Sequence, residues 1–296
     1  MFQLPKYLLS EKTKHRSEQV ILSIAILSYL VHLAIIYALR FNWIQLNVSP
    51  ELFNQPSAAI YTPFSFIIAY EVYLLVYYLP QSITTYISKQ YEIITLILIR
   101  RSFKDLSNLE LTSDWFQVKN DLVFTYDIIA SLLLFVMLYF FYRSRQVAQM
   151  KYASEDDLPD KITRFIQIKR WIAALLIPVL IGLALYTFTS WLVGTIYPHL
   201  DIAVAYKDIN NVFFDEFFSL MIIVDVILLL ISFFHTDEFH KVIRNSGFVI
   251  STILIRLSFS VDGLINTALI VFAVLFGLLI LIIHNKYEEH SIKPEA

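Results

Sequence analysis

The chain alternates between long apolar runs and short polar stretches. Six runs are long enough to cross a bilayer: residues 20–39, 63–79, 122–142, 171–194, 217–234 and 264–283. A helix of about 17–25 apolar residues spans the hydrocarbon core of a membrane. This pattern predicts an all-α fold, a polytopic bundle of transmembrane helices.

Two further apolar segments, residues 91–103 and 247–261, are shorter, and each carries an arginine. Segments of this length are either short spans or amphipathic or re-entrant helices. Their nature decides whether the chain crosses the membrane six or eight times.

The distribution of lysine and arginine distinguishes these two counts, because cytoplasmic loops are enriched in both residues. With eight spans, sixteen basic residues fall on the side of the two termini and five on the other side, while Arg100 and Arg256 lie in the membrane. With six spans the distribution becomes twelve against eleven. The sequence therefore predicts eight spans, two of them short, in the cytoplasmic (cell inner) membrane, with both termini in the cytoplasm.

The two halves of the chain resemble each other. Residues 64–79 and 218–233 are identical at six of sixteen positions, and residues 94–103 and 250–259 at seven of ten. We therefore expect a duplicated four-helix unit. Because each unit has an even number of spans, the two repeats should be parallel, related by an axis along the membrane normal.

This duplication divides the chain into five parts. They are a cytoplasmic N-terminal segment (1–19), a first four-helix repeat (20–142), a cytoplasmic linker (143–170), a second repeat (171–284) and a cytoplasmic tail (285–296).

Composition supports the membrane assignment and excludes several functions. The chain is 57% apolar and 16% charged, whereas a soluble domain is about 45–50% apolar and about 25% charged. A net charge of −2 gives no reason to expect nucleic acid as a partner. The absence of cysteine excludes disulfides, thiolate metal sites and cysteine nucleophiles. Five glycines are few for a filter loop or a broken transport helix.

Four charges within the apolar segments are the main candidate functional residues. Glu71 and Asp225 lie nine to ten residues before the hairpins of their halves, and Arg100 and Arg256 follow those hairpins. At about 1.5 Å per residue, each acid returns to a depth similar to that of the following arginine. The sequence predicts two equivalent pairs, Glu71 with Arg100 and Asp225 with Arg256.

An ionised side chain at mid-membrane costs several kcal/mol unless it is paired or hydrated. The pairs could fix the helix register, sense voltage or line an ion path, and an arginine could instead reach the outer headgroups. Arg100, beside Arg101, is the better candidate for that last behaviour.

Asp127 and His32 are secondary candidates. Asp127 lies five residues into the fourth span, where an interfacial acid is expected, with a proton carrier as the alternative. His32 lies in the middle of the first span, where a hydrogen bond to a neighbouring helix is expected, with a haem or metal ligand as the alternative.

The hairpin around residue 237 holds four side chains of types that bind metals. They are His235, Asp237, Glu238 and His240. Because the first half has no equivalent cluster, we interpret this hairpin as a solvated turn and expect neither a metal nor another cofactor.

The arrangement resembles two known families. An acid on the second helix followed by an arginine on a later one resembles the four-helix voltage-sensor module, although here each segment has one arginine or an adjacent pair rather than one at every third position. The ILIR-type segment after an acidic second helix is similar to the phosphate-starvation-inducible membrane protein family. Each resemblance covers about 100 residues per half and depends on two or three polar positions.

Three functions compete at this point. The first is the passage, or the gating of passage, of an ion or small solute. The second is a non-conducting membrane sensor or accessory subunit, and the third is an intramembrane enzyme. An enzyme would need a nucleophile–base pair or clustered ligands at one depth, and the sequence shows neither, so no catalytic residue is expected. The expected partners are the lipid bilayer, ions or small solutes, and a second copy or a membrane partner subunit.

Overall fold

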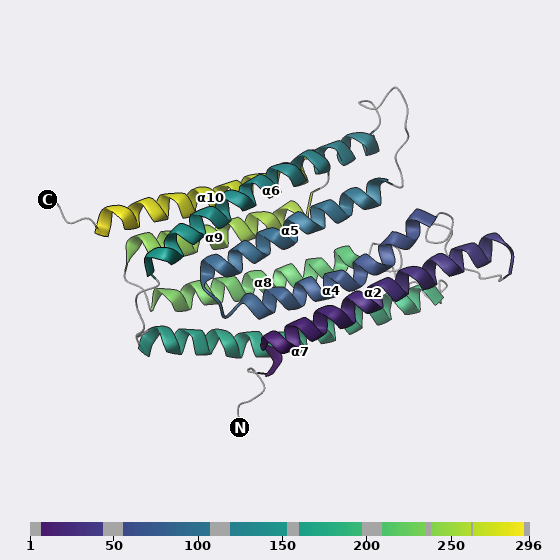
Figure 1. Cartoon of the computed structure of the whole chain (residues 1–296), viewed down its shortest axis with the longest axis horizontal. Helices are drawn as coiled ribbons and strands as arrows, with labels where there is room; N and C mark the ends of the chain where they lie inside the picture. The colour runs from purple at the N-terminus through teal and green to yellow at the C-terminus, as the bar shows by residue number, and fades with distance from the viewer. Residues whose placement is uncertain are drawn as a thin grey trace.

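The protein is a bundle of long helices that run side by side (Figure 1). A computed structural model describes residues 7–43, 56–106, 119–152, 160–196, 209–234, 238–261 and 263–292, which contain no strand. The eight long α-helices of these ranges are α2 (Glu11–Arg40), α4 (Tyr61–Tyr78), α5 (Ile83–Leu106), α6 (Lys119–Tyr152), α7 (Asp160–Ile196), α8 (Ile209–Phe233), α9 (Phe239–Ser258) and α10 (Leu264–Ile292). The 3-10 turn η1 (Pro56–Ile60) precedes α4. Each of the eight expected segments overlaps one helix.

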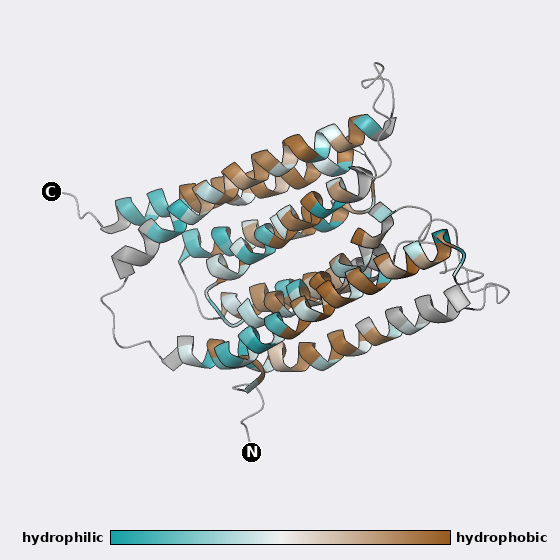
Figure 2. Ribbon diagram, turned by 45° about the vertical axis from the view of Figure 1, so that its right-hand side comes forward, coloured by the Kyte–Doolittle hydropathy of each residue, from teal (hydrophilic) through white to brown (hydrophobic). Residues whose placement is uncertain are grey.

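An apolar band passes through the middle of the bundle, with hydrophilic residues towards the helix ends (Figure 2). Within the described ranges, five helices are long and apolar enough to cross a membrane: α2, α6, α7, α8 and α10. Helix α4 contributes a shorter apolar stretch, Thr62–Tyr78. Large apolar side chains such as Leu132, Phe135 and Leu175 are exposed on the outside of the bundle. Lipid would cover such a surface, so the chain is a membrane-embedded helical protein.

The two segments expected to be short belong to longer helices. Helix α5 has 24 residues and begins at Ile83, and α9 has 20 residues and begins at Phe239. Both helices begin well before their apolar stretches. The turns that precede these stretches contain polar residues such as Lys89 in α5 and Arg244 in α9. At the start of α5, Ser82 Oγ accepts a hydrogen bond of 3.2 Å from the backbone N–H of Thr85, which is the contact of an N-cap.

Helices that follow one another in the chain pack together within each half. In the first half, α2 packs on α4, α4 on α5 and α5 on α6. In the second half, α7 packs on α8, α8 on α9 and α9 on α10. The halves meet mainly where α6 lies against α10, with further contacts of α4 with α7 and of α5 with α9.

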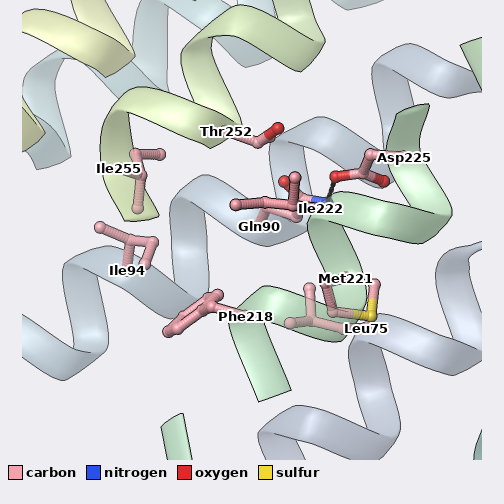
Figure 3. A pocket seen from close by; sticks show the side chains of 9 residues that line it. All are labelled: Leu75, Gln90, Ile94, Phe218, Met221, Ile222, Asp225, Thr252 and Ile255. Carbon is pink, nitrogen blue, oxygen red and sulfur yellow. Dashed lines mark hydrogen bonds between the residues drawn. The ribbon is translucent and has the colours of Figure 1, made fainter. Parts of the chain in front are cut away.

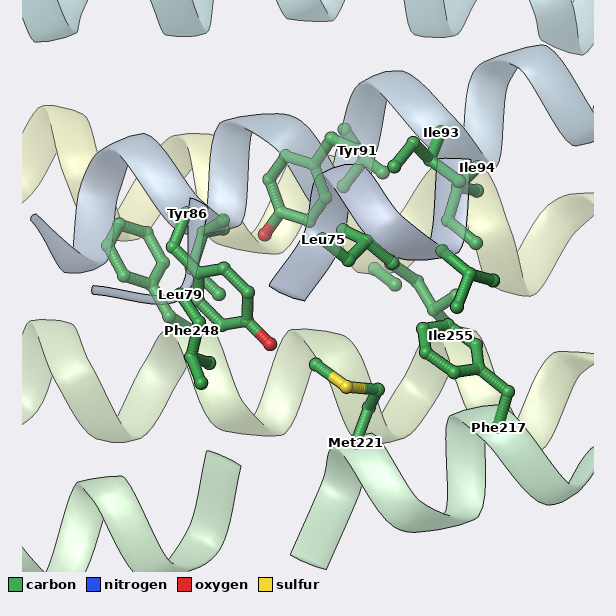
Figure 4. Close-up of a cluster of buried hydrophobic side chains, with 14 of the residues drawn as sticks. Leu75, Leu79, Tyr86, Tyr91, Ile93, Ile94, Phe217, Met221, Phe248 and Ile255 are labelled. Atoms are coloured by element: carbon green, nitrogen blue, oxygen red, sulfur yellow. The ribbon is translucent and has the colours of Figure 1, made fainter. Parts of the chain in front are cut away.

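The apolar core lies where α4, α5, α8 and α9 converge (Figure 4). Tyr91 of α5 is fully buried there, and its hydroxyl is 2.7 Å from Ser251 Oγ of α9. Ser251 in turn donates to the carbonyl of Ala273 in α10 at 2.7 Å. A Cβ on Gly277 would lie 1.8 Å from the Tyr91 hydroxyl oxygen. This glycine therefore allows three helices to approach closely.

Polar contacts connect the helices at one end of the bundle, which we call the terminal end. Lys14 of α2 donates to the Tyr78 hydroxyl at 3.2 Å, and Lys89 lies over the same ring. Asn285 of α10 donates to the carbonyl of Ser144 in α6 at 2.9 Å. Lys89 also lies over the ring of Tyr142 in α6, so the beginning of α2 and the end of α10 lie at the same end of the bundle.

Candidate functional site

A buried carboxylate, Asp225, lies between the two halves. Helix α8 directs it towards α5 and α9, and only 4% of the residue is exposed. Gln90 of α5 donates from Nε2 to Asp225 Oδ2 at 3.3 Å, and the Thr252 hydroxyl of α9 lies beside the carboxylate (Figure 3). The buried Tyr86 hydroxyl also faces Asp225, without the geometry of a hydrogen bond. All of these partners are neutral.

A small cavity adjoins this carboxylate. Its volume is about 20 Å³, which is room for about one water molecule. Asp225, Gln90 and Thr252 supply the polar part of its wall, and apolar side chains line the rest (Figure 3). The apolar lining residues are Leu75, Ile94, Phe218, Met221, Ile222 and Ile255.

A buried lysine lies near this site. Lys169 of α7 is 2% exposed, and its Nζ donates to the backbone carbonyl of Gln81 at 2.6 Å. It forms no ion pair with Asp225 or with any other acid in the described part of the chain. A cation is therefore held close enough to influence Asp225 without neutralising it by direct contact.

The structure brings Glu71 and Arg100 together. Arg100 Nη1 of α5 lies 2.5 Å from Glu71 Oε1 of α4, and the two side chains are 11% and 4% exposed. The second carboxylate oxygen and the second terminal nitrogen of the pair are buried without hydrogen bonds. A buried pair of this kind connects α4 to α5 and compensates the charge of each partner.

The expected pair of Asp225 with Arg256 is wrong, because the two side chains do not meet. Arg256 Nη2 is instead 3.2 Å from the Ser219 hydroxyl. Ser219 precedes Asp225 by six residues, about 9 Å along α8, whereas Thr252, which lies beside Asp225, is one turn before Arg256. Helices α8 and α9 therefore pair in a register that places Arg256 beyond Asp225.

Asp127 is the centre of a polar network at the opposite end of the bundle. It is fully buried and receives two hydrogen bonds from Arg101 of α5, one of them from Nη2 to Oδ1 at 2.6 Å. Thr267 of α10 donates to the same Oδ1 at 2.8 Å, and Arg101 Nη1 donates to Asn266 Oδ1 at 2.7 Å. Asn266 Nδ2 donates a hydrogen bond to the backbone carbonyl of Ser258 at 2.6 Å. The network joins α5, α6, α9 and α10.

Sequence reasoning missed several of these residues. With eight spans, Arg101 is one of the five basic residues on the outer side and has no predicted acidic partner, and the sequence pattern does not distinguish Gln90 or Lys169. The adjacent arginines at positions 100 and 101 project about 100° apart on a helix, so they can reach acids on different neighbours. Two acids, one on each neighbouring helix, were the signal that could have identified this double pairing.

His32 and the hairpin near residue 237 have different surroundings. His32 of α2 is buried, and its Nδ1 lies 2.5 Å from the Thr62 hydroxyl oxygen of α4. This is the interhelical hydrogen bond expected of a lone histidine. His235 and Asp237 lie outside the described residues. Glu238 precedes the first turn of α9, and His240 lies within that turn.

Asp225 differs from Glu71 and Asp127 in its partners. Glu71 and Asp127 each face an arginine, whereas Asp225 has neutral donors and a cavity of the size of a water molecule. A carboxylate in this setting can hold a proton or a small cation in place of a fixed counter-charge.

No known family model, curated protein or solved structure matches the chain. The resemblances to voltage-sensor modules and to the phosphate-starvation-inducible family therefore stay predictions.

Proposed function

We propose that this protein passes a proton or a small cation across a membrane by way of Asp225. The contrast of Asp225 with two other buried acids, Glu71 and Asp127, carries the proposal: those two are neutralised by arginines, and Asp225 is not. Buried membrane acids that lack a counter-charge commonly belong to proton relays or ion paths. The position of Asp225 between the halves also favours this function, because transport sites commonly lie between repeats.

The proposal includes eight spans built as two parallel repeats, with both termini in the cytoplasm. Its supports are the biased distribution of basic residues and the matching order of helix contacts in the two halves. Helices α4, α5 and α9 carry their polar side chains towards protein partners, which would allow them to cross beside the five more apolar helices.

Flux into proteoliposomes tests the proposal. Purified protein is reconstituted into liposomes that hold a fluorescent indicator of H⁺, Na⁺ or K⁺, and the gradient of the matching ion is imposed on each preparation. We expect faster dissipation of at least one gradient than in protein-free liposomes. Asp225→Asn should slow this flux about tenfold or more, a change of about 1.4 kcal/mol in the barrier.

Glu92→Gln is the matched control for this experiment. Glu92 lies on α5 close to Gln90, but its carboxylate forms an ion pair with Lys89 at 2.8 Å, away from the cavity. It should leave the flux unchanged. Wild-type liposomes that dissipate none of the three gradients faster than empty ones would contradict the proposal.

A non-conducting sensor or accessory subunit is the second candidate. The observation in its favour is that Glu71 and Asp127 are bound to arginines in sites that connect neighbouring helices, as a rigid scaffold requires. A membrane partner that co-purifies in a fixed ratio, together with an absence of flux, would favour this alternative.

A further inference from the structure

Two histidines and a glutamate converge where α9 begins and α10 ends. The residues are His240 of α9 and His284 and Glu288 of α10, and one ligand atom from each lies within 4.8 Å of the other two. Glu288 Oε1 is 3.2 Å from His284 Nε2 and 3.9 Å from His240 Nε2. The two imidazole rings stack with their centroids 5.2 Å apart.

The helices themselves position this cluster. His284 and Glu288 are four residues apart, so they lie on the same face of α10, one turn from each other. The close packing of α9 on α10 brings His240 to that face: a Cβ on Gly247 would lie 2.9 Å from Ile280. His284 and Glu288 are 4% and 9% exposed. The cluster is therefore built into the interior of the hairpin.

The two neighbours of His284 Nε2 require opposite hydrogen-bonding roles from that nitrogen. Its Nε2 lies 2.8 Å from Arg244 Nη1, which can only donate, and 3.2 Å from Glu288 Oε1, which as a carboxylate can only accept. With a proton on Nε2, His284 can donate to Glu288 but cannot accept a hydrogen bond from Arg244. Without that proton, His284 can accept from Arg244 but cannot donate to Glu288. The other ring nitrogen, Nδ1, is buried without a hydrogen bond. A cation would be bound by the Nε2 lone pair and the Glu288 oxygen together, and Arg244 would then keep its other acceptor, Asn245 Oδ1.

We propose that His240, His284 and Glu288 bind a first-row transition-metal cation, with Zn²⁺ as the best fit. Imidazole nitrogens with a carboxylate oxygen suit Zn²⁺, whereas Mg²⁺ and Ca²⁺ take oxygen ligands. Metal–ligand bonds of about 2.0–2.2 Å place tetrahedral ligands about 3.3 Å apart. The distance of 3.2 Å from His284 Nε2 to Glu288 Oε1 is already close to this value, whereas His240 Nε2, at 3.9 Å from the same oxygen, would have to approach.

Glu238 is the candidate fourth ligand. Its Oε2 lies 3.2 Å from His240 Nε2, and its other oxygen accepts a hydrogen bond of 2.8 Å from Lys241. The resulting set of two imidazoles and two carboxylates would hold the start of α9 and the end of α10 together.

Metal analysis of the full-length protein tests the site. The protein is purified without a polyhistidine tag, equilibrated with Zn²⁺, dialysed and analysed by mass spectrometry, and Co²⁺ serves as a spectroscopic substitute. We expect about one ion per chain and a Co²⁺ spectrum of tetrahedral type. His240→Asn and Glu288→Gln should weaken binding about 100-fold or more, because even outer-sphere partners change metal affinity by about 10–100-fold.

His290→Gln is the matched control, since His290 lies on the same helix but is exposed and contacts the backbone of its own turn. It should bind metal like the wild type. Arg244→Gln gives a gain-of-function test that does not depend on damaging the site. Removing a positive charge beside the proposed cation should tighten binding. Absence of stoichiometric uptake by the wild-type protein, or equal affinity in His240→Asn, would overturn the proposal.

Discussion

At the scale of single residues, the buried acids differ in how their charge is compensated. The pairing of Glu71 with Arg100 could be anticipated, because a hairpin returns the chain to the same depth. The surroundings of Asp225 could not, because they depend on the register of α8 against α9 and on the approach of α5 from the other half. Sequence spacing gives depth within one hairpin only approximately, as the register of α8 against α9 shows, and leaves contacts between hairpins undetermined.

Neutralising Asp127 should damage the fold more than neutralising Asp225. Asp127→Asn leaves the partly buried Arg101 without its counter-ion, and breaking a fully buried pair costs about 3–5 kcal/mol, which is an upper bound here. Asp225→Asn keeps the shape of the side chain, and Asp225 has no ionic partner in the described part of the chain. The loss of stability should therefore be about 1 kcal/mol, that of a hydrogen bond. Unfolding in detergent, followed by circular dichroism against denaturant, measures both losses.

A double variant separates charge from shape in this comparison. Asp127→Asn combined with Arg101→Gln removes both charges and should recover much of the lost stability. If Asp127→Asn proves no more destabilising than Asp225→Asn, the Arg101 network does not have the role that its geometry indicates.

Gly277 should tolerate no side chain. An alanine there would place its Cβ against the Tyr91 hydroxyl, which must then give up Ser251 or move α10 away from α5. Overpacking of this kind costs about 1–3 kcal/mol. Gly182→Ala is the control, because it lies in α7 with no atom within 4 Å of the added Cβ. It should leave the denaturation midpoint unchanged or raise it slightly, and equal losses in the two variants would contradict the argument.

At the scale of elements, hydropathy located all eight helices but placed the beginning of several of them too late, and this made two of them look short. The apolar stretches of α5 and α9 begin near residues 91 and 247, whereas the helices begin at Ile83 and Phe239. The first two turns of α5 and α9 include polar side chains such as Gln90 and His240. These side chains contact other residues of the protein. Such residues lower the hydropathy averaged over a sequence window, although their side chains face neighbouring helices.

The first turn of α5 should depend on its cap. Ser82 accepts the N–H of Thr85, as Ser10 accepts that of Thr13 at the start of α2. Ser82→Ala should destabilise that turn by about 1 kcal/mol. Hydrogen exchange followed by mass spectrometry should then show about fivefold faster exchange in the peptide around Ser88. Ser10→Ala is the matched control and should accelerate exchange in α2 alone.

At the scale of the whole molecule, the interior polar contacts explain how less apolar helices can belong to a membrane bundle. Helices α5 and α9 fall short of the hydropathy of a typical span, yet they lie at the centre, where α4, α8 and the polar networks surround them. The more apolar α2, α6 and α7 carry large side chains on the outer surface. Burial inside protein lowers the cost of polar residues at membrane depth.

This arrangement predicts the topology, which single cysteines in a cysteine-free chain can test. With eight spans, His15→Cys near the start of α2 and Lys286→Cys near the end of α10 should both resist an impermeant thiol reagent in intact cells. Trp43→Cys, at the opposite end of α2, should react, because Trp43 is 81% exposed. If only the five most apolar helices crossed, the odd number would place positions 15 and 286 on opposite sides of the membrane. Labelling of one of these two positions but not the other would therefore contradict eight spans. Permeabilised cells are the control for buried thiols, because all three cysteines should react in them.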